Sequence, residues 1–132
     1  MRYRLVAALT LALATSSACK KEQKSDTGTT GTSTASADPA SEAKAIFRMK
    51  CVVCHGETGE GTGPGAAALN PKPQNYTDPA WQAKVTDDEI KKAILEGGAA
   101  VGKNPAMPPN PDLKSKPQVV DELLKIVRGF KK

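Results

Sequence analysis

The chain of 132 residues suits a single small domain, and its composition limits what that domain can be. Only 4% of the residues are aromatic, with one tryptophan, which is little material for a self-sufficient core. We therefore expect a large apolar prosthetic group to fill part of the interior. The formal net charge of +5 is modest, and lysines alternate with acids instead of forming an arginine-rich stripe. This pattern indicates a solvated surface and no nucleic-acid partner.

The first eighteen residues have the pattern of an export signal. Arg2 and Arg4 form a basic start, residues 5–14 form an apolar run, and small residues follow. The run is too short to span a bilayer. We therefore predict a signal peptide over residues 1–18, with export to the periplasm or cell envelope.

Cys19 follows the small residues directly. This arrangement resembles a bacterial lipoprotein signal, in which the cysteine becomes the lipid-bearing first residue. Ser16 stands where that signal usually has leucine, so ordinary cleavage beside an incidental cysteine is the alternative. Residues 20–38 are rich in Ser, Thr and Gly and lack apolar periodicity. We predict a lipid-anchor cysteine and flexible linker over residues 19–38, which tether the following domain to a membrane.

Residues 39–132 are predicted to be all-α, beginning with a helix at Pro39. Asp38 can cap this helix, and proline suits its first position. The apolar residues Ile46, Met49 and Val53 share one face, so the helix is expected to run into Cys51.

Two further helices carry recognisable start signals. The helix after Thr86 opens with a capping box formed by Thr86 and Glu89 and stops at Gly97. The last helix, over residues 117–130, has Ser115 and Gln118 in capping positions. Its apolar stripe consists of Val120, Leu123, Leu124 and Val127. Long loops rich in Gly and Pro join the helices, one short helical turn is expected near 78–82, and no segment alternates as a strand.

The sequence Cys51-Val-Val-Cys54-His55 holds two of the three cysteines and the only histidine. Three chemistries use such a cluster: a thiol–disulfide pair, a zinc site, or covalent haem attachment. Zinc needs four ligands, and beyond the linker only these three cysteine and histidine residues are present. A thioredoxin-like pair would lie where a strand meets a helix, and no strand is predicted.

Covalent haem attachment accounts for all three residues. The thiols of Cys51 and Cys54 add to the haem vinyl groups, and the adjacent His55 becomes an axial iron ligand. Met107, in the proline-stiffened sequence NPAMPPN, is the candidate for the second axial ligand. Met49 lies too close to the attachment site and is assigned to the core. A gap-filling role for Met107 is the alternative.

Residues 39–132 resemble a monohaem class I cytochrome c. The resemblance rests on AKAIFRMKCVVCHGETGEGTGPG, on NPAMPPNPDL and on LLKIVRGF. It implies that Phe47 and Ala43 belong to the contact between the first and last helices. It also implies that the Pro64 carbonyl accepts the second ring N–H of the histidine and that Leu69 covers the haem. Ile126 stands where the family usually has an aromatic residue, which leaves the aromatic contact with Phe47 open.

The expected function is electron transfer by one covalent haem c, without enzymatic activity. A monomer with two protein axial ligands would carry electrons between membrane-associated redox partners. Lysines such as Lys50, Lys72 and Lys103 either steer acidic partners or merely solvate the surface. The alternatives are a haem-based ligand sensor or peroxidase-like protein with a displaceable Met107, and a thiol–disulfide redox protein.

Overall fold

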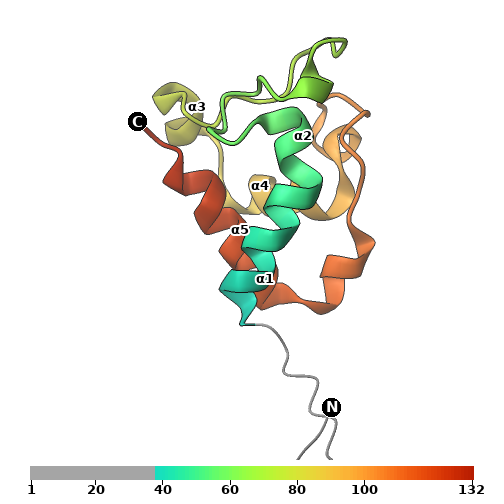
Figure 1. The fold of residues 1–132 in the computed structure, drawn as a ribbon, viewed down its shortest axis with the longest axis vertical. Helices are drawn as coiled ribbons and strands as arrows, with labels where there is room; N and C mark the ends of the chain where they lie inside the picture. The colour runs from blue at the N-terminus through green and yellow to red at the C-terminus, as the bar shows by residue number, and fades with distance from the viewer. Residues whose placement is uncertain (1–37) are drawn as a thin grey trace, which may run out of the picture. The chain divides into compact units, whose positions relative to one another are not determined.

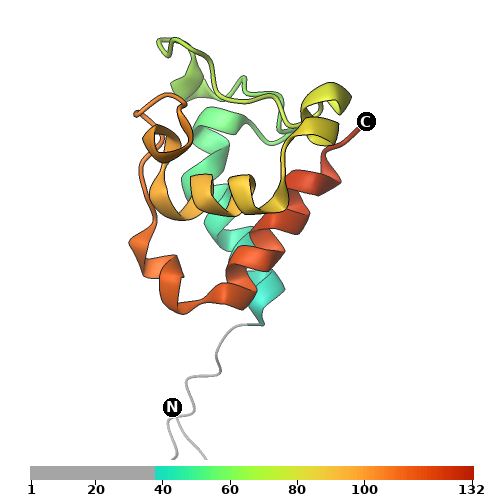
Figure 2. The same cartoon turned by 180° about the vertical axis from the view of Figure 1, so that it is seen from behind.

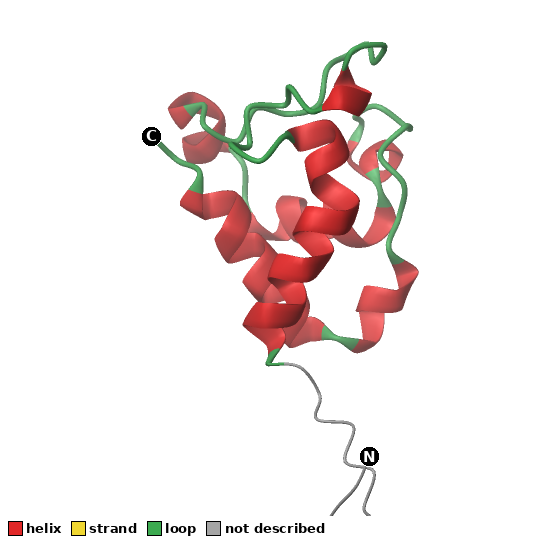
Figure 3. Ribbon diagram, in the orientation of Figure 1, coloured by secondary structure: helices red, strands yellow, loops and turns green. Residues whose placement is uncertain are grey.

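The computed structural model describes residues 38–132, and within this range all the regular secondary structure is helical (Figures 1 and 3). The α-helices are α1 (Pro39–Ile46), α2 (Val52–His55), α3 (Pro79–Lys84), α4 (Asp87–Glu96) and α5 (Pro117–Gly129). A π-helical segment, η1 (Phe47–Cys51), joins α1 to α2, and the 3-10 helices are η2 (Pro64–Ala66), η3 (Gly98–Val101) and η4 (Pro111–Ser115). No strand occurs in residues 38–132, which confirms the all-α prediction. The predictions on the signal peptide, Cys19 and most of the linker lie outside the described residues.

The first three helical segments follow one another without a break and lead into the cysteine motif (Figure 1). The Asp38 carboxylate accepts a hydrogen bond from the main-chain N–H of Ser41 at 3.1 Å, so the predicted cap is confirmed. The N–H of Val52 bonds to the carbonyl of Phe47, which widens the turn immediately before the motif. Such π-turns are rare and are frequent at functional sites.

The exposure of Met49 differs from the prediction. Its side chain is 72% exposed and that of Val53 is 47% exposed, whereas Ile46 is buried. The predicted apolar face is therefore wrong beyond Ile46. Met49 lies within the π-helical segment η1 and Val53 follows it, so the 3.6-residue period assumed in the prediction does not hold across these positions.

Helix α4 begins and ends as predicted. The Thr86 hydroxyl accepts from the N–H of Glu89 at 3.1 Å, and the Glu89 carboxylate accepts from the N–H of Thr86 at 2.9 Å. Gly97 ends the helix at a φ of 83°. The start of α5 differs from the prediction, because its cap position is Lys116 and carries no side-chain cap bond. The Ser115 hydroxyl instead donates to the Asp112 carbonyl within η4, which extends up to that residue.

The core lies mainly between α1 and α5, which pack against each other (Figures 1 and 2). Ala43 is fully buried, as expected where two helices approach closely. The rings of Phe47 and Phe130 lie 5.6 Å apart, so the aromatic contact exists but uses Phe130, one turn beyond Ile126. The predicted stripe of α5 is buried throughout: Val120, Leu123, Leu124 and Val127. None of the helices in the described range is long and apolar enough to cross a membrane.

Candidate functional site

A largely apolar cavity of about 630 Å³ opens beside the cysteine motif. Its volume is within the range of about 300–1,000 Å³ that is usual for cofactor pockets. The residues predicted to bind the haem line it together: Cys51, Cys54, His55, Leu69 and Met107. Apolar and aromatic side chains from α3, from its C-cap residue and from α4 complete the wall, among them Trp81, Val85 and Ile90. The fold therefore brings the motif and the distant Met107 to one cavity.

Both ring nitrogens of the buried His55 have polar neighbours. Nδ1 lies 3.3 Å from the main-chain carbonyl of Gln74, and Nε2 lies 3.0 Å from the hydroxyl of Tyr76. A carbonyl can only accept, so Nδ1 carries the proton and Nε2 presents its lone pair. Burial lowers the pKa of His55, and the bond to Gln74 opposes that shift. A neutral imidazole that is unprotonated at Nε2 is the form that binds a metal, and iron there would take the lone pair to which the Tyr76 hydroxyl donates.

The role expected for Pro64 is not the one that the structure gives it. The acceptor for the second ring nitrogen of His55 is the Gln74 carbonyl, and Leu69 lines the cavity whereas Pro64 does not. Pro64 opens η2 on the surface, directly after Gly63, whose N–H donates to the Cys54 carbonyl at 3.1 Å. The Gly-Pro pair therefore bonds to the end of α2 through Gly63, whereas the imidazole is held by Gln74, ten residues after Pro64.

The loop that carries Met107 is fixed by main-chain bonds. The Met107 N–H donates to the Asn104 carbonyl at 3.2 Å, and the Met107 carbonyl accepts from the N–H of Gly98 at 3.0 Å. A side chain at Gly97 would come within 2.8 Å of the Met107 carbonyl, so the loop packs directly on this glycine pair. Met107 itself is half-buried and borders both the cavity and the core.

Two asparagines anchor the same loop, and the sequence analysis missed both. The side-chain amide of Asn104 donates to the Pro71 carbonyl at 3.0 Å, across the cavity-lining loops. That of Asn110 donates to the Ile94 carbonyl in α4 at 2.8 Å. Their positions at either end of the proline-rich NPAMPPN sequence are the one local signal that could have pointed to them.

Cys51 does not have the lowered pKa of a thiol–disulfide exchange cysteine. Burial raises the pKa of the Cys51 thiol to about 11, so it is protonated at neutral pH. Exchange requires a thiolate, and exchange cysteines have lowered pKa values. A zinc site also lacks its ligands, because nowhere in residues 38–132 do three His, Cys, Asp or Glu side chains come together in a way that could hold a metal ion.

Comparison with known proteins identifies the class. A family model for cytochrome c matches residues 40–125, and the chain belongs to this family. It is a class I c-type cytochrome with the all-α fold of that class. The solved structure of the KustC0563 c-type cytochrome is 35% identical, with 68% of this chain and 96% of that chain covered and a TM-score of 0.48. No match was found among curated proteins.

The protein accordingly binds one covalently attached haem c, as predicted. The residues present fit this group. Two thiols spaced by two residues, an imidazole unprotonated at Nε2 and a thioether all border one apolar cavity. The volume of that cavity also agrees with the expectation that a prosthetic group fills part of the interior, where side chains alone provide little apolar core.

Proposed function

We propose that the protein is a monomeric electron carrier whose haem is attached through Cys51 and Cys54 and has His55 and Met107 as axial ligands. Its haem iron would supply a reversible one-electron couple. Members of the family are typically electron carriers. The observation that carries the proposal is that all four residues line the same cavity.

The residues around the two ligands support a carrier because they restrict movement. His55 is buried and held through Nδ1, and the loop of Met107 is bonded at its N–H and its carbonyl. Ligands held in this way change little in position between the two oxidation states. Thioether ligation also favours the reduced state and raises the potential.

Ligation by His55 and Met107 would leave no coordination position open to oxygen, peroxide or another small ligand. This distinguishes a carrier from the ligand sensor or peroxidase-like alternative, in which Met107 would be displaced. Carbon monoxide tests the difference. The reduced wild-type protein should show no carbon monoxide adduct, whereas Met107→Ala should form one. Met49→Ala is the matched control, because Met49 is exposed and should not affect binding. An adduct in the wild-type protein would favour the sensor.

We also propose that redox partners are acidic and dock near the mouth of the cavity. Lys50, Lys72 and Lys103 all border the cavity. Lys50 pairs with Asp112 at 3.2 Å, but both side chains are about half exposed, so solvent screens the pair. The rate of electron exchange with an acidic partner should therefore fall as ionic strength rises. A rate that increases with salt would contradict this part of the proposal.

The location of the protein follows from its first 38 residues and from the chemistry of its class. Cytochromes of this type are exported. We propose that residues 1–18 are removed, that Cys19 carries lipid, and that the linker up to residue 38 tethers the cytochrome domain, residues 39–132, to a membrane facing the periplasm or exterior. Cys19→Ala should release haem-stained protein into the soluble fraction. Wild-type protein that is already soluble, with an unmodified Cys19, would refute the anchor.

A further inference from the structure

Gln82 is a buried polar residue in the short helix α3, with 5% of its surface exposed. Its side-chain amide donates to the carbonyl of Tyr76 at 2.7 Å and to that of Val127 at 2.9 Å. Its side-chain oxygen accepts from Arg128 at 2.9 Å. Burying an amide costs free energy unless its bonds are made, and here they all are. An apolar side chain would avoid that cost, so the bonds themselves must have a use.

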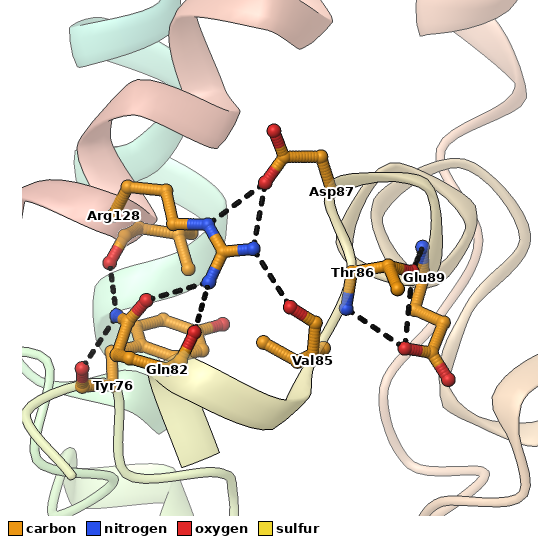
Figure 4. A network of polar contacts seen from close by, with 8 residues as sticks. Tyr76, Gln82, Val85, Thr86, Asp87, Glu89 and Arg128 are labelled. Atoms are coloured by element: carbon orange, nitrogen blue, oxygen red, sulfur yellow. Dashed lines mark hydrogen bonds and ion pairs between the residues drawn. The ribbon is translucent and has the colours of Figure 1, made fainter. Parts of the chain in front are cut away.

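Arg128 fixes the other side of Gln82 (Figure 4). Besides the side-chain oxygen of Gln82 it donates to the Gln82 main-chain carbonyl and to that of Val85, each at 2.8 Å. Two of its nitrogens also bond to one carboxylate oxygen of Asp87, at 2.9 and 2.6 Å. A helix of six residues is not stable alone, so these bonds, together with the packing of α3, determine where it lies.

The carbonyl that Gln82 holds belongs to Tyr76, and Tyr76 reaches the histidine. Its N–H donates to the Gly59 carbonyl at 2.7 Å, which secures the other side of the same residue. Its ring stacks on His55, and its hydroxyl bonds to Nε2. Gln74, two residues earlier, provides the carbonyl that faces Nδ1. Residues 74–76 therefore contact both nitrogens and one face of the imidazole.

We propose that Gln82 and Arg128 are positioning residues for His55. They act through residues 74–76, by holding the Tyr76 carbonyl so that the Gln74 carbonyl stays within bonding distance of Nδ1. The inference rests on the proposed function, in which His55 is an iron ligand. A histidine whose second N–H donates a good hydrogen bond is a more basic ligand. A more basic ligand favours the oxidised iron, so loosening the bond to Gln74 raises the midpoint potential.

The test is the potential of Gln82→Met in the haem-loaded protein. Methionine is close in size to glutamine and makes neither amide bond, and it leaves the net charge unchanged. We expect an upward shift of the midpoint potential, together with a changed paramagnetic NMR shift of the His55 ring protons. Arg128→Lys also keeps the charge but loses the bonds to Gln82 and Val85. It should give a smaller shift of the midpoint potential in the same direction. It replaces Gln82→Met as the test variant if Gln82→Met does not yield haem-loaded protein.

Thr86→Ala is the matched control. Thr86 is next to Asp87, but its side chain bonds only to Glu89 within the capping box, so its loss should lower the melting temperature and leave the potential unchanged (Figure 4). Gln82→Met and Arg128→Lys that lower the melting temperature but keep the wild-type potential and His55 shifts would overturn the inference. The absorption spectrum of the wild-type protein distinguishes failure of this inference from failure of the proposed function. Without His/Met ligation in the wild-type protein, the proposed function itself is wrong.

Discussion

The phenol ring of Tyr76 lies nearly parallel to the imidazole of His55, with ring centroids 4.4 Å apart and an interplanar angle of 12°. Tyr76 is buried and also packs against Trp81 and Phe130, at centroid distances of 5.5 and 6.2 Å. Through Phe130 this group of aromatic rings reaches the end of α5. The plane of the imidazole is therefore set by packing as well as by the bond to Gln74.

Tyr76 should contribute mainly through its ring. Tyr76→Phe keeps the ring and loses one neutral hydrogen bond, which costs about 0.5–1.5 kcal/mol at most. Because iron at Nε2 would take the lone pair that the hydroxyl uses, the loss should be at the low end in the haem-loaded protein. Tyr76→Ala removes the packing as well and should cost about 3–5 kcal/mol. Urea unfolding measures both. Equal losses would show that the hydroxyl, and not the ring, is what matters.

Leu113 should be the most sensitive of the leucines to truncation. It is 1% exposed, and it is the largest side chain in the described range that is fully buried. Leu113→Ala should lower the free energy of unfolding by roughly 2–5 kcal/mol, because it removes apolar contacts and leaves a cavity. Met49→Ala, at an exposed position, should change it by no more than about 0.5 kcal/mol. Thermal unfolding of the two variants gives the comparison, and similar values would contradict the assigned burial.

Gly63 should not tolerate a side chain. A Cβ atom there would overlap the main-chain oxygens of Val52 and Val53, which cannot move without disturbing the helix that carries the motif. Gly63→Ala should destabilise the protein by about 1–3 kcal/mol or more and lower the yield of haem-loaded protein. Gly129→Ala is the control, since nothing lies within 4 Å and alanine is favoured in a helix. A Gly63→Ala variant with wild-type yield and stability would contradict the close approach.

The fold should depend on haem attachment. The cavity of about 630 Å³ and the low aromatic content leave a small core without the prosthetic group. A Cys51→Ala, Cys54→Ala double variant should therefore show much less helix by circular dichroism than the wild-type protein. Native helicity in that variant would mean that the side-chain core is sufficient.

Features that the sequence predicted well are local. The capping box of Thr86 and Glu89, the stop at Gly97 and the apolar stripe of α5 depend on neighbouring residues, so they can be recognised from short patterns. The spacing of Cys51, Cys54 and His55 is likewise a property of five consecutive positions.

Features that were missed depend on contacts between distant segments or on an irregular turn. Met49 is exposed and lies in the π-helical segment Phe47–Cys51, which the 3.6-residue period of a regular helix does not anticipate. Nδ1 of His55 bonds to the carbonyl of Gln74 and not, as expected, to that of Pro64. The sequence could not indicate this, because every residue has a main-chain carbonyl. The bonds between Gln82 and Arg128 join α3 to α5, and either residue alone reads as an ordinary surface residue.

Absorption spectroscopy of the oxidised protein tests the central claim most directly, because sulfur–iron(III) ligation gives a charge-transfer band toward the red end of the spectrum. Wild-type protein and Met49→Ala should both show the band, and Met107→Ala should lack it and have a lower midpoint potential. Met107 borders the cavity with His55, whereas Met49 is 72% exposed. Loss of the band in Met49→Ala with its retention in Met107→Ala would contradict the account, as would its absence from the wild-type protein.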